Sequence, residues 1–295
     1  MERLEAVNGM KYCAAMLAAA REPFVTAPTR VTRLFWLLAL WPTDALAWGL
    51  QTHLYFAQYA LALLPLADPE LRAAARRLPR LVLAGACLPD LAIVGVLMGT
   101  PAFRRAHLWS TLRRVATAPR SEAEAALAIG YASHLLSDVV AHSLFVPEHE
   151  RRIGRGAMVA HLGAEWAMDQ HVRGKLEFDP AQALRGFEKE AIGLVCRALP
   201  ASPALAARAL GILARGDAVL RASPVPALCR AAFGTKRFDG YLARTVQMLG
   251  GLDQALGGGF EDWCGSDPEG GGGDQGAERC AGEHVARIVQ PEDHA

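Results

Sequence analysis

The segment Ser133–Phe145, with the sequence SHLLSDVVAHSLF, constrains the fold more than any other part of the chain. His134, Asp138 and His142 follow one another at intervals of four residues, so on a helix they lie on one slowly drifting face. Leucine and valine occupy positions between them, which indicates a helix inside the protein. Three ionisable groups in an interior need polar partners. This segment therefore predicts a buried helix with a polar site along one side.

The composition favours helices throughout the chain. The 295 residues are 52% apolar, and alanine and leucine, which suit helices, supply much of that excess. Strand signals are poor, since β-branched clusters are short and no Asn-Gly or Asp-Gly lies between alternating apolar residues. We expect an all-α protein with a single multi-helix domain. Helices are predicted at 53–65, 69–78, 122–145, 156–174, 180–199, 203–221 and 236–256.

The beginning of the chain has the pattern of an export signal. Residues 30–47, RVTRLFWLLALWPTDALA, contain two arginines, an apolar run and the small-residue cleavage pattern Ala45-Leu46-Ala47. We expect cleavage before Trp48 and a periplasmic or secreted mature protein. The stretch before this signal is long, so a true start downstream of Met1 is an alternative. An uncleaved membrane anchor is the competing interpretation of the apolar run.

A second apolar run, Arg80–Thr100, is long enough to suggest a transmembrane helix. Pro89 and Asp90 lie at its centre, where a charge in lipid would be costly. We therefore expect a buried segment that is broken at Pro89 and that directs the side chain of Asp90 into a polar site.

The end of the chain differs from its body. From Gly257 onward the sequence is GGGFEDWCGSDPEGGGGDQG, which can bury little apolar surface. Residues 261–295 contain 2 Lys and Arg against 9 Asp and Glu, whereas 48–260 contain 24 against 17. We expect a signal peptide with an extended amino-terminal region at 1–47, a helical domain at 48–256 and a disordered acidic tail at 257–295.

The cysteines give no metal site. Removal of the signal leaves five, none in a CxxC pair, so a thiolate zinc site has no support. Cys264 with Cys280, or Cys196 with Cys229, are candidate disulfides in an oxidising compartment. Cys87 lies in an apolar run and is expected to be a buried free thiol.

A second helical pair follows the first. His161 and Glu165 are again four residues apart, and imidazole nitrogen with carboxylate oxygen at helical spacing is a usual way to hold zinc. One such pair alone is more often a structural hydrogen bond, but two pairs within about thirty residues favour a metal site. No Gly-x-Ser-x-Gly elbow, Walker loop, His-Glu-x-x-His motif or aromatic-basic cluster of a nucleic-acid module is present.

The ordered set of these residues resembles the zinc-dependent phospholipase C superfamily. That superfamily includes bacterial phospholipases C, the catalytic domain of glycosylphosphatidylinositol-specific phospholipase D and single-strand-specific fungal nucleases. Its pattern is a mature chain that begins with Trp, followed by His, Asp, His, a His-xxx-Asp pair, another His and a His-xxx-Glu/Asp pair. The chain offers, in this order, Trp48, His53, Asp90, His107, His134-xxx-Asp138, His142 and His161-xxx-Glu165.

The resemblance implies up to three zinc ions in a buried cluster, held by three groups of ligands. These groups are His107, His134 and Asp138, with Asp90 beside them as ligand or general base; His142, His161 and Glu165; and His53, Asp138 as a bridge, and the free amine and carbonyl oxygen of Trp48. Cleavage before Trp48 would create the last ligand, because a free amine exists only at a chain terminus.

One spacing departs from the pattern. Many members place the next His six residues after the paired Asp, where this chain has Leu144. His142 falls four residues after Asp138, which resembles the glycosylphosphatidylinositol phospholipase D branch, as does the GLQTH sequence near Trp48. His149 is the alternative ligand if the helix breaks before Pro147.

The resemblance implies a zinc-dependent phosphodiesterase that hydrolyses phospholipids with a metal-activated water, Asp90 being the catalytic residue. A nuclease-like phosphodiesterase of the same superfamily is the alternative enzyme, although nucleic acid is the less favoured substrate. The alternative of a different class is a non-catalytic zinc-binding or membrane-associated protein that keeps the fold. A transient contact with a membrane surface is expected of the phospholipase.

Overall fold

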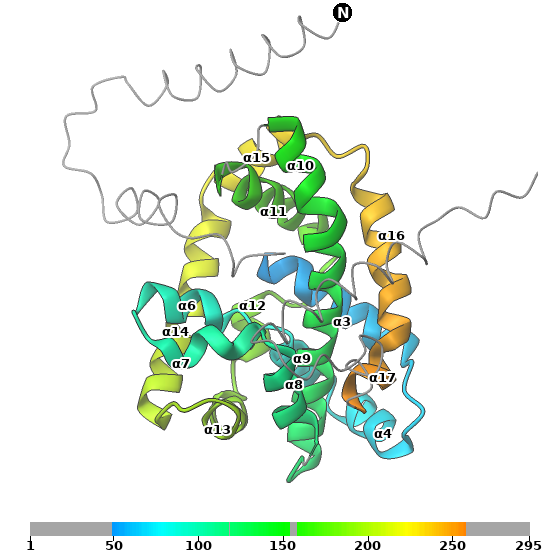
Figure 1. The fold of residues 1–295 in the computed structure, drawn as a ribbon, viewed down its shortest axis with the longest axis vertical. Coiled ribbons are helices and arrows are strands. Elements are labelled where there is room, and N and C mark those ends of the chain that lie inside the picture. The colour runs from blue at the N-terminus through cyan, green and yellow to red at the C-terminus, as the bar shows by residue number, and fades with distance from the viewer. Residues whose placement is uncertain (1–48, 118, 154–157, 258–295) are drawn as a thin grey trace, which may run out of the picture.

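The structure is a computed structural model that describes residues 49–117, 119–153 and 158–257. The expected signal peptide, Trp48 and all of the expected tail after Gly257 lie outside the described residues. Within the described ranges the chain forms helices and turns and no strand (Figure 1). The expected all-α fold is therefore confirmed.

The helices keep the labels of Figure 1, and η marks 3-10 and π turns. Their bounds are α3 Leu50–Leu63, α4 Pro69–Arg77, α5 Pro79–Gly85, α6 Leu91–Leu97, α7 Pro101–Arg104, η1 Arg105–His107, α8 Trp109–Ala116, α9 Glu122–Val140, η2 Ala141–Phe145, α10 Val146–Ile153, α11 Met158–Val172, η3 Arg173–Lys175, α12 Pro180–Leu184, α13 Glu188–Ala198, α14 Pro203–Ala222, α15 Val225–Phe233, α16 Phe238–Met248, η4 Leu249–Gly251 and α17 Leu252–Leu256.

Helix α9 is the centre of the fold. Every residue from Ala125 to Val140 is buried, so this helix meets protein on all sides rather than along one stripe. Helices α3, α4, α5, α8, α16 and α17 all pack against it. Ser121 begins the helix by accepting a hydrogen bond from the backbone N–H of Glu124, and Glu122 lies in the first turn, where its charge suits the helix dipole.

Helices α5 and α9 cross at backbone contact. A Cβ atom at Gly130 would overlap the carbonyl of Val82, and one at Gly85 would overlap the carbonyl of Leu127. Only glycine permits this approach. The contact brings the break after α5, where Asp90 lies, next to the middle of α9.

The remaining helices enclose this centre. Helices α10, α11 and α15 gather at the upper end of Figure 1, whereas α4 and α13 lie at the lower end. Helix α11 packs against α3, α10 and α15. No helix in the described ranges is long and apolar enough to cross a membrane.

Several predicted helix boundaries are wrong. The single helix expected at 180–199 is two helices, α12 and α13, because Gly186 takes a φ of 88° that a helix cannot continue through. The helix expected at 236–256 is interrupted by the 3-10 turn at Leu249–Gly251. The helix expected at 122–145 ends at Val140 and passes through a π turn into α10. Helices α5, α6, α7, α8, α10 and α15 were not among the predicted helices.

The apolar run at 80–100 has the expected break. Helix α5 ends at Gly85, α6 begins at Leu91, and Asp90 between them is buried. Cys87 is a buried free thiol, as expected, and Cys196 and Cys229 are also free rather than joined.

Candidate metal centre

The imidazole of His134 is held by the backbone of a neighbouring segment. His134 is fully buried on α9, and its Nδ1–H donates to the carbonyl of Ala86, just after α5, at 2.8 Å. A carbonyl can only accept, so Nδ1 carries a proton, and Nε2 is the ring nitrogen that faces the site. This Nε2 lies 3.1 Å from Oδ2 of Asp138, one helical turn later.

His53 reaches the same carboxylate from α3. Its Nδ1 lies 2.9 Å from Oγ of Ser137, whose hydroxyl donates to the carbonyl of His134. Ser137 has one proton and must therefore accept from the Nδ1–H of His53, which leaves Nε2 facing Oδ1 of Asp138 at 3.3 Å. The rings of His53 and His134 stack with centroids 3.4 Å apart. Two helices thus present parallel imidazoles to the two oxygens of one carboxylate.

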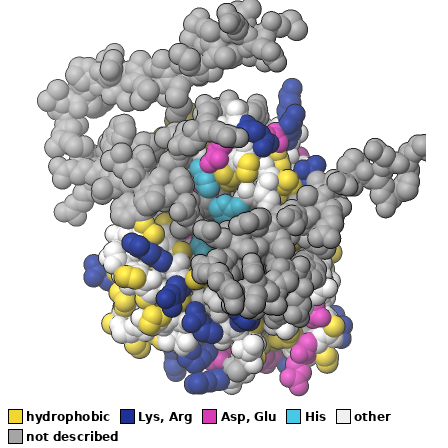
Figure 2. Space-filling view, in the orientation of Figure 1, with side chains coloured by type: hydrophobic (Ala, Val, Ile, Leu, Met, Phe, Trp, Pro, Cys, Tyr) yellow, Lys and Arg dark blue, Asp and Glu magenta, His cyan; other side chains and the backbone are white. Residues whose placement is uncertain are grey.

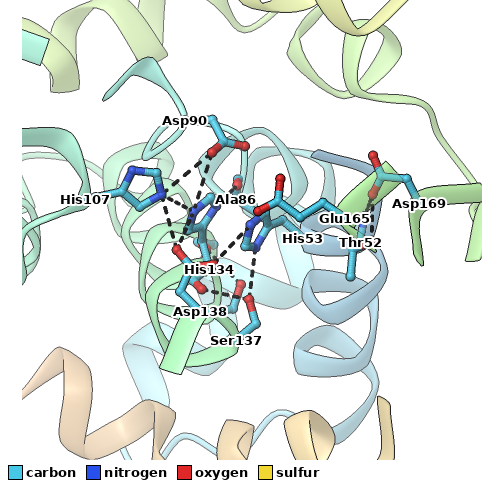
Figure 3. A network of polar contacts seen from close by, with 12 residues as sticks. Thr52, His53, Ala86, Asp90, His107, His134, Ser137, Asp138, Glu165 and Asp169 are labelled. Carbon is cyan, nitrogen blue, oxygen red and sulfur yellow. Dashed lines mark hydrogen bonds and ion pairs between the residues drawn. The ribbon is translucent and has the colours of Figure 1, made fainter. Parts of the chain in front are cut away.

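The segment between α5 and α8 adds another carboxylate and a third imidazole. Nε2 of His107, at the end of η1, lies 2.9 Å from Nε2 of His134 and 3.2 Å from Oδ2 of Asp138. Oδ1 of Asp90 lies 3.7 Å from the nitrogen of His107 and 3.9 Å from that of His134. Figure 3 shows these side chains turned toward one another.

Two groups of possible ligands come together here. Among the described residues, one consists of His53, His134 and Asp138 and the other of Asp90, His107 and His134, each with its ligand atoms within 4.8 Å of one another. His134 belongs to both. We call these five residues the His-Asp cluster.

Burial and attraction set the charges of the His-Asp cluster. Burial raises the pKa of Asp90 to about 6, although His134 and His107 act to lower it. Burial also acts to raise the pKa of Asp138, but His134 and His53 outweigh it and hold that pKa well below its usual range. For His134, burial acts to lower the pKa, and Asp138 and Asp90 raise it above its usual value. Asp138 is therefore anionic at neutral pH.

A second set of residues lies where α10 and α11 meet. Nε2 of His161 is 2.9 Å from Oε1 of Glu165, and its Nδ1 is 3.6 Å from Oε1 of Glu150 on α10. The rings of His142 and His161 have centroids 5.9 Å apart. Burial raises the pKa of Glu165 to about 7 and lowers that of His142 to about 4. His142 lies in the π turn η2, directly after α9.

Two histidines of the candidate centre are less buried than the others. His53 and His134 are fully buried, whereas His107 and His142 are partly exposed. Imidazoles reach the surface in the middle of the face in Figure 2, with acidic and basic side chains nearby.

Comparison with known proteins identifies the family. Residues 52–196 match the family model for zinc-dependent phospholipase C. The segment 52–196 belongs to this family. The matched range runs from α3 to α13 and contains the whole His-Asp cluster and the second set. No curated protein and no solved structure matches the chain significantly.

The residues of this zinc-dependent phospholipase C segment fit a zinc site. Both carboxylate oxygens of Asp90 and of Asp138 are buried and lack a hydrogen-bond donor in the described part of the chain. Such oxygens are costly unless a cation or donor meets them. Imidazole nitrogens and carboxylate oxygens are zinc ligands, and separations near 3 Å suit neighbouring ligands at bonds of about 2.0–2.2 Å.

The predicted site residues fall into three classes. The structure brings together His53, Asp90, His107, His134 and Asp138, and it places His142, His161 and Glu165 in the neighbouring set. Trp48 lies outside the described residues. Their assignment as zinc ligands stays a prediction.

His149, the alternative ligand, lies elsewhere. The chain stays helical through Pro147, so the condition for that alternative is not met. The Nδ1–H of His149 donates to the carbonyl of Phe145, and the ring packs against Phe145 and Phe233. It lines a pocket of about 760 Å³ beside α15 and α16.

Three residues of the site were missed by sequence analysis. Ser137 orients His53, Glu150 faces His161, and Asp169 holds the start of α3. Asp169 carried a signal, because it extends the His161-Glu165 pair by four more residues on α11. Glu150 carried none, since the π turn changes which residues of α10 face α11.

Proposed function

We propose that the protein hydrolyses a phosphodiester bond of phospholipids with zinc bound at the His-Asp cluster. The observation that carries this proposal is the convergence of Asp90, His107, His134 and Asp138 within the range that matches the family. The buried oxygens without donors on Asp90 and Asp138 support cation binding at this point.

The side chains have separate roles in this proposal. When bound, zinc would neutralise phosphate oxygens and lower the pKa of a water molecule. Asp138 faces three imidazoles and would hold the cluster together as a shared ligand. Asp90 is the general base: it would accept the proton of the attacking water. Without zinc, burial raises the pKa of Asp90 to about 6, and bound zinc would lower that pKa, so Asp90 would be deprotonated at neutral pH.

Three zinc ions would account for the full set of residues. The His-Asp cluster offers two overlapping groups of ligands, and the set of His142, His161 and Glu165 offers a third. A purely structural zinc site closes its coordination shell, whereas a catalytic one keeps a position open. The partial exposure of His107 and His142 supports an open site.

The test combines metal analysis with a substrate panel. Protein beginning at Trp48 is loaded with zinc, and bound zinc per chain is measured beside phosphate-ester release from phospholipid vesicles and from single-stranded DNA. The proposal expects three zincs and turnover of lipid, and Asp90→Asn should retain the fold and lose turnover. Turnover of DNA alone would favour the nuclease-like function. No more than one zinc and no turnover would favour a non-catalytic protein.

We also propose export and cleavage before Trp48, which would place the enzyme in the periplasm or outside the cell. Gly49, the first described residue, lies one position before α3 and four before His53, so the free amine of Trp48 would begin near the cluster. A Gly-Ser extension before Trp48 should leave the helices intact but remove one zinc and most of the activity. Equal zinc content and activity in both forms would refute the amine ligand. During turnover the enzyme would contact a membrane surface transiently.

A further inference from the structure

Asp169 is a buried carboxylate outside the predicted site. It lies on α11, where it follows His161 and Glu165 at intervals of four residues. The carboxylate points at Thr52 of α3, and Glu165 lies between it and the His-Asp cluster (Figure 3). Asp169 is therefore no member of the cluster, although it shares a helix with the second set of residues.

This carboxylate caps α3 from another helix. Oδ1 of Asp169 accepts two hydrogen bonds from Thr52, one from the backbone N–H at 2.9 Å and one from the hydroxyl at 2.7 Å. The first turn of α3 has no acidic residue, and its N-cap residue, Gly49, has no side chain to cap with. A helix start needs such acceptors for its free N–H groups. Thr52 directly precedes His53, so the capped turn is the one that carries the cluster imidazole.

The contact with Gly49 is close. A Cβ atom at this position would overlap the carboxylate of Asp169. The start of α3 is thus fixed by hydrogen bonds at Thr52 and by steric contact at Gly49.

Asp169 keeps this position at a cost. It is 2% exposed, and none of the ion pairs among the described residues includes it. Burial raises its pKa to about 8, although the hydrogen bonds from Thr52 act to lower it. A buried carboxyl group that has hydrogen bonds but no charged partner is an expensive helix cap. Its hydrogen bonds to Thr52 and its contact with Gly49 hold the first turn of α3 in place.

We propose that Asp169 is a positioning residue that clamps the first turn of α3 to α11 and thereby holds His53 against Asp138. The inference deepens the proposed function and rests on it. Helix α11 also carries His161 and Glu165, so one carboxylate ties the helix of the second set to a ligand of the His-Asp cluster. Loss of the clamp would let His53 move away from Asp138 while the other ligands stay in place.

The experiment compares zinc affinity and stability in four variants. Asp169→Ala removes the acceptor, Asp169→Asn keeps an acceptor oxygen, and Thr52→Val removes the hydroxyl. Asp217→Ala is the matched control: Asp217 is also buried with a raised pKa, but it pairs with Arg221 on α14. Zinc per chain is followed during titration with a chelator, and unfolding is followed by circular dichroism.

The clamp predicts a loss confined to one zinc. In Asp169→Ala, one zinc should bind about 10- to 100-fold more weakly, as expected when a supporting residue of a metal site is removed. The remaining zincs should bind as in the wild type, and kcat should fall with KM unchanged. Asp169→Asn and Thr52→Val should show smaller losses of affinity for the same zinc. Asp217→Ala should unfold at a lower temperature with its zinc affinities unchanged.

A second pair of variants tests the steric contact. Gly49→Ala should weaken binding of the same zinc, because the added Cβ would displace the carboxylate of Asp169. Adding Asp169→Ala should make the Gly49→Ala change nearly silent, since the obstacle is then gone. Wild-type zinc affinities in Asp169→Ala, or equal losses in Asp169→Ala and Asp217→Ala, would overturn the clamp. If Asp169→Ala does not fold, wild-type affinity in both Asp169→Asn and Thr52→Val would overturn it. A wild type that binds zinc but does not hydrolyse phospholipid would refute the proposed function alone.

Discussion

Replacing Asp138 with asparagine should dismantle the His-Asp cluster. The carboxylate lies within 3.1–3.3 Å of imidazole nitrogens from His53, His107 and His134. It is the only side chain of the cluster that faces all three imidazoles. Asparagine keeps the size but removes the charge, and its amide nitrogen cannot bind a cation. The Asp138→Asn protein should therefore lose about two of the three proposed zincs.

The size of the effect follows from burial. Asp138 and His134 are buried and attract each other, so removing one partner should cost about 3–5 kcal/mol even without zinc. For a domain of this size that corresponds to a fall of about 6–20 °C in Tm. Bound zinc adds stability that the variant cannot regain: an ion present at about 1,000 times its Kd contributes about 4 kcal/mol.

The assay is thermal unfolding with and without zinc, combined with metal analysis. The Tm difference between wild type and Asp138→Asn should be larger in excess zinc than in chelator. Asp217→Ala serves as a control, because it should lower Tm by a similar amount in both conditions. A folded Asp138→Asn protein with the full zinc content of the wild type would refute the shared-ligand role.

Other changes probe the neighbouring features. His142→Ala should remove one zinc and nearly all activity. His149→Ala should keep its zinc and lose stability, because it empties space beside Phe145. Zinc analysis with urea unfolding separates the two, and the reverse outcome would make His149 the ligand. Gly130→Ala should destabilise the fold by about 1–3 kcal/mol by forcing α5 from α9, measured by urea unfolding, and an unchanged midpoint would contradict the close crossing. Asp169 keeps its proton in the folded protein up to about pH 8 but loses it near pH 4 when unfolded. The folded state therefore binds more protons between these values, and stability in chelator should decrease as pH rises from about 4 to 8. Measured by urea unfolding, the free energy of unfolding should decrease less with pH in Asp169→Asn than in the wild type. Equal pH dependence in the two proteins would exclude burial of a carboxyl group without a charged partner at this position.

Local rules predicted the parts of the site that depend on one helix. The interval of four between His134 and Asp138 places both at one point because α9 is regular there. Pro89 marks the break that leaves Asp90 between helices, since proline cannot continue α5. The resemblance supplied the order of the ligands along the chain, and the structure brings five of them together.

Long-range contacts could not be read from local patterns. The Asp169-Thr52 hydrogen bonds join residues 117 positions apart, and no periodicity in the sequence pairs them. The crossing at Gly130 and Gly85 looks in the sequence like two ordinary small residues. The division of 180–199 depends on the backbone angle of Gly186, which helix propensity does not determine.

The π turn at Ala141–Phe145 closes with the N–H of Val146 bonded to the carbonyl of Ala141, five residues back. Such a turn is an α-helix that has gained one residue. Deleting one residue here should therefore restore an unbroken α-helix, and the residues beyond it, His149 and Glu150 among them, should keep nearly the same faces. An alignment of this segment with its relatives should therefore allow a gap in the middle of a helix, where gaps are usually penalised most.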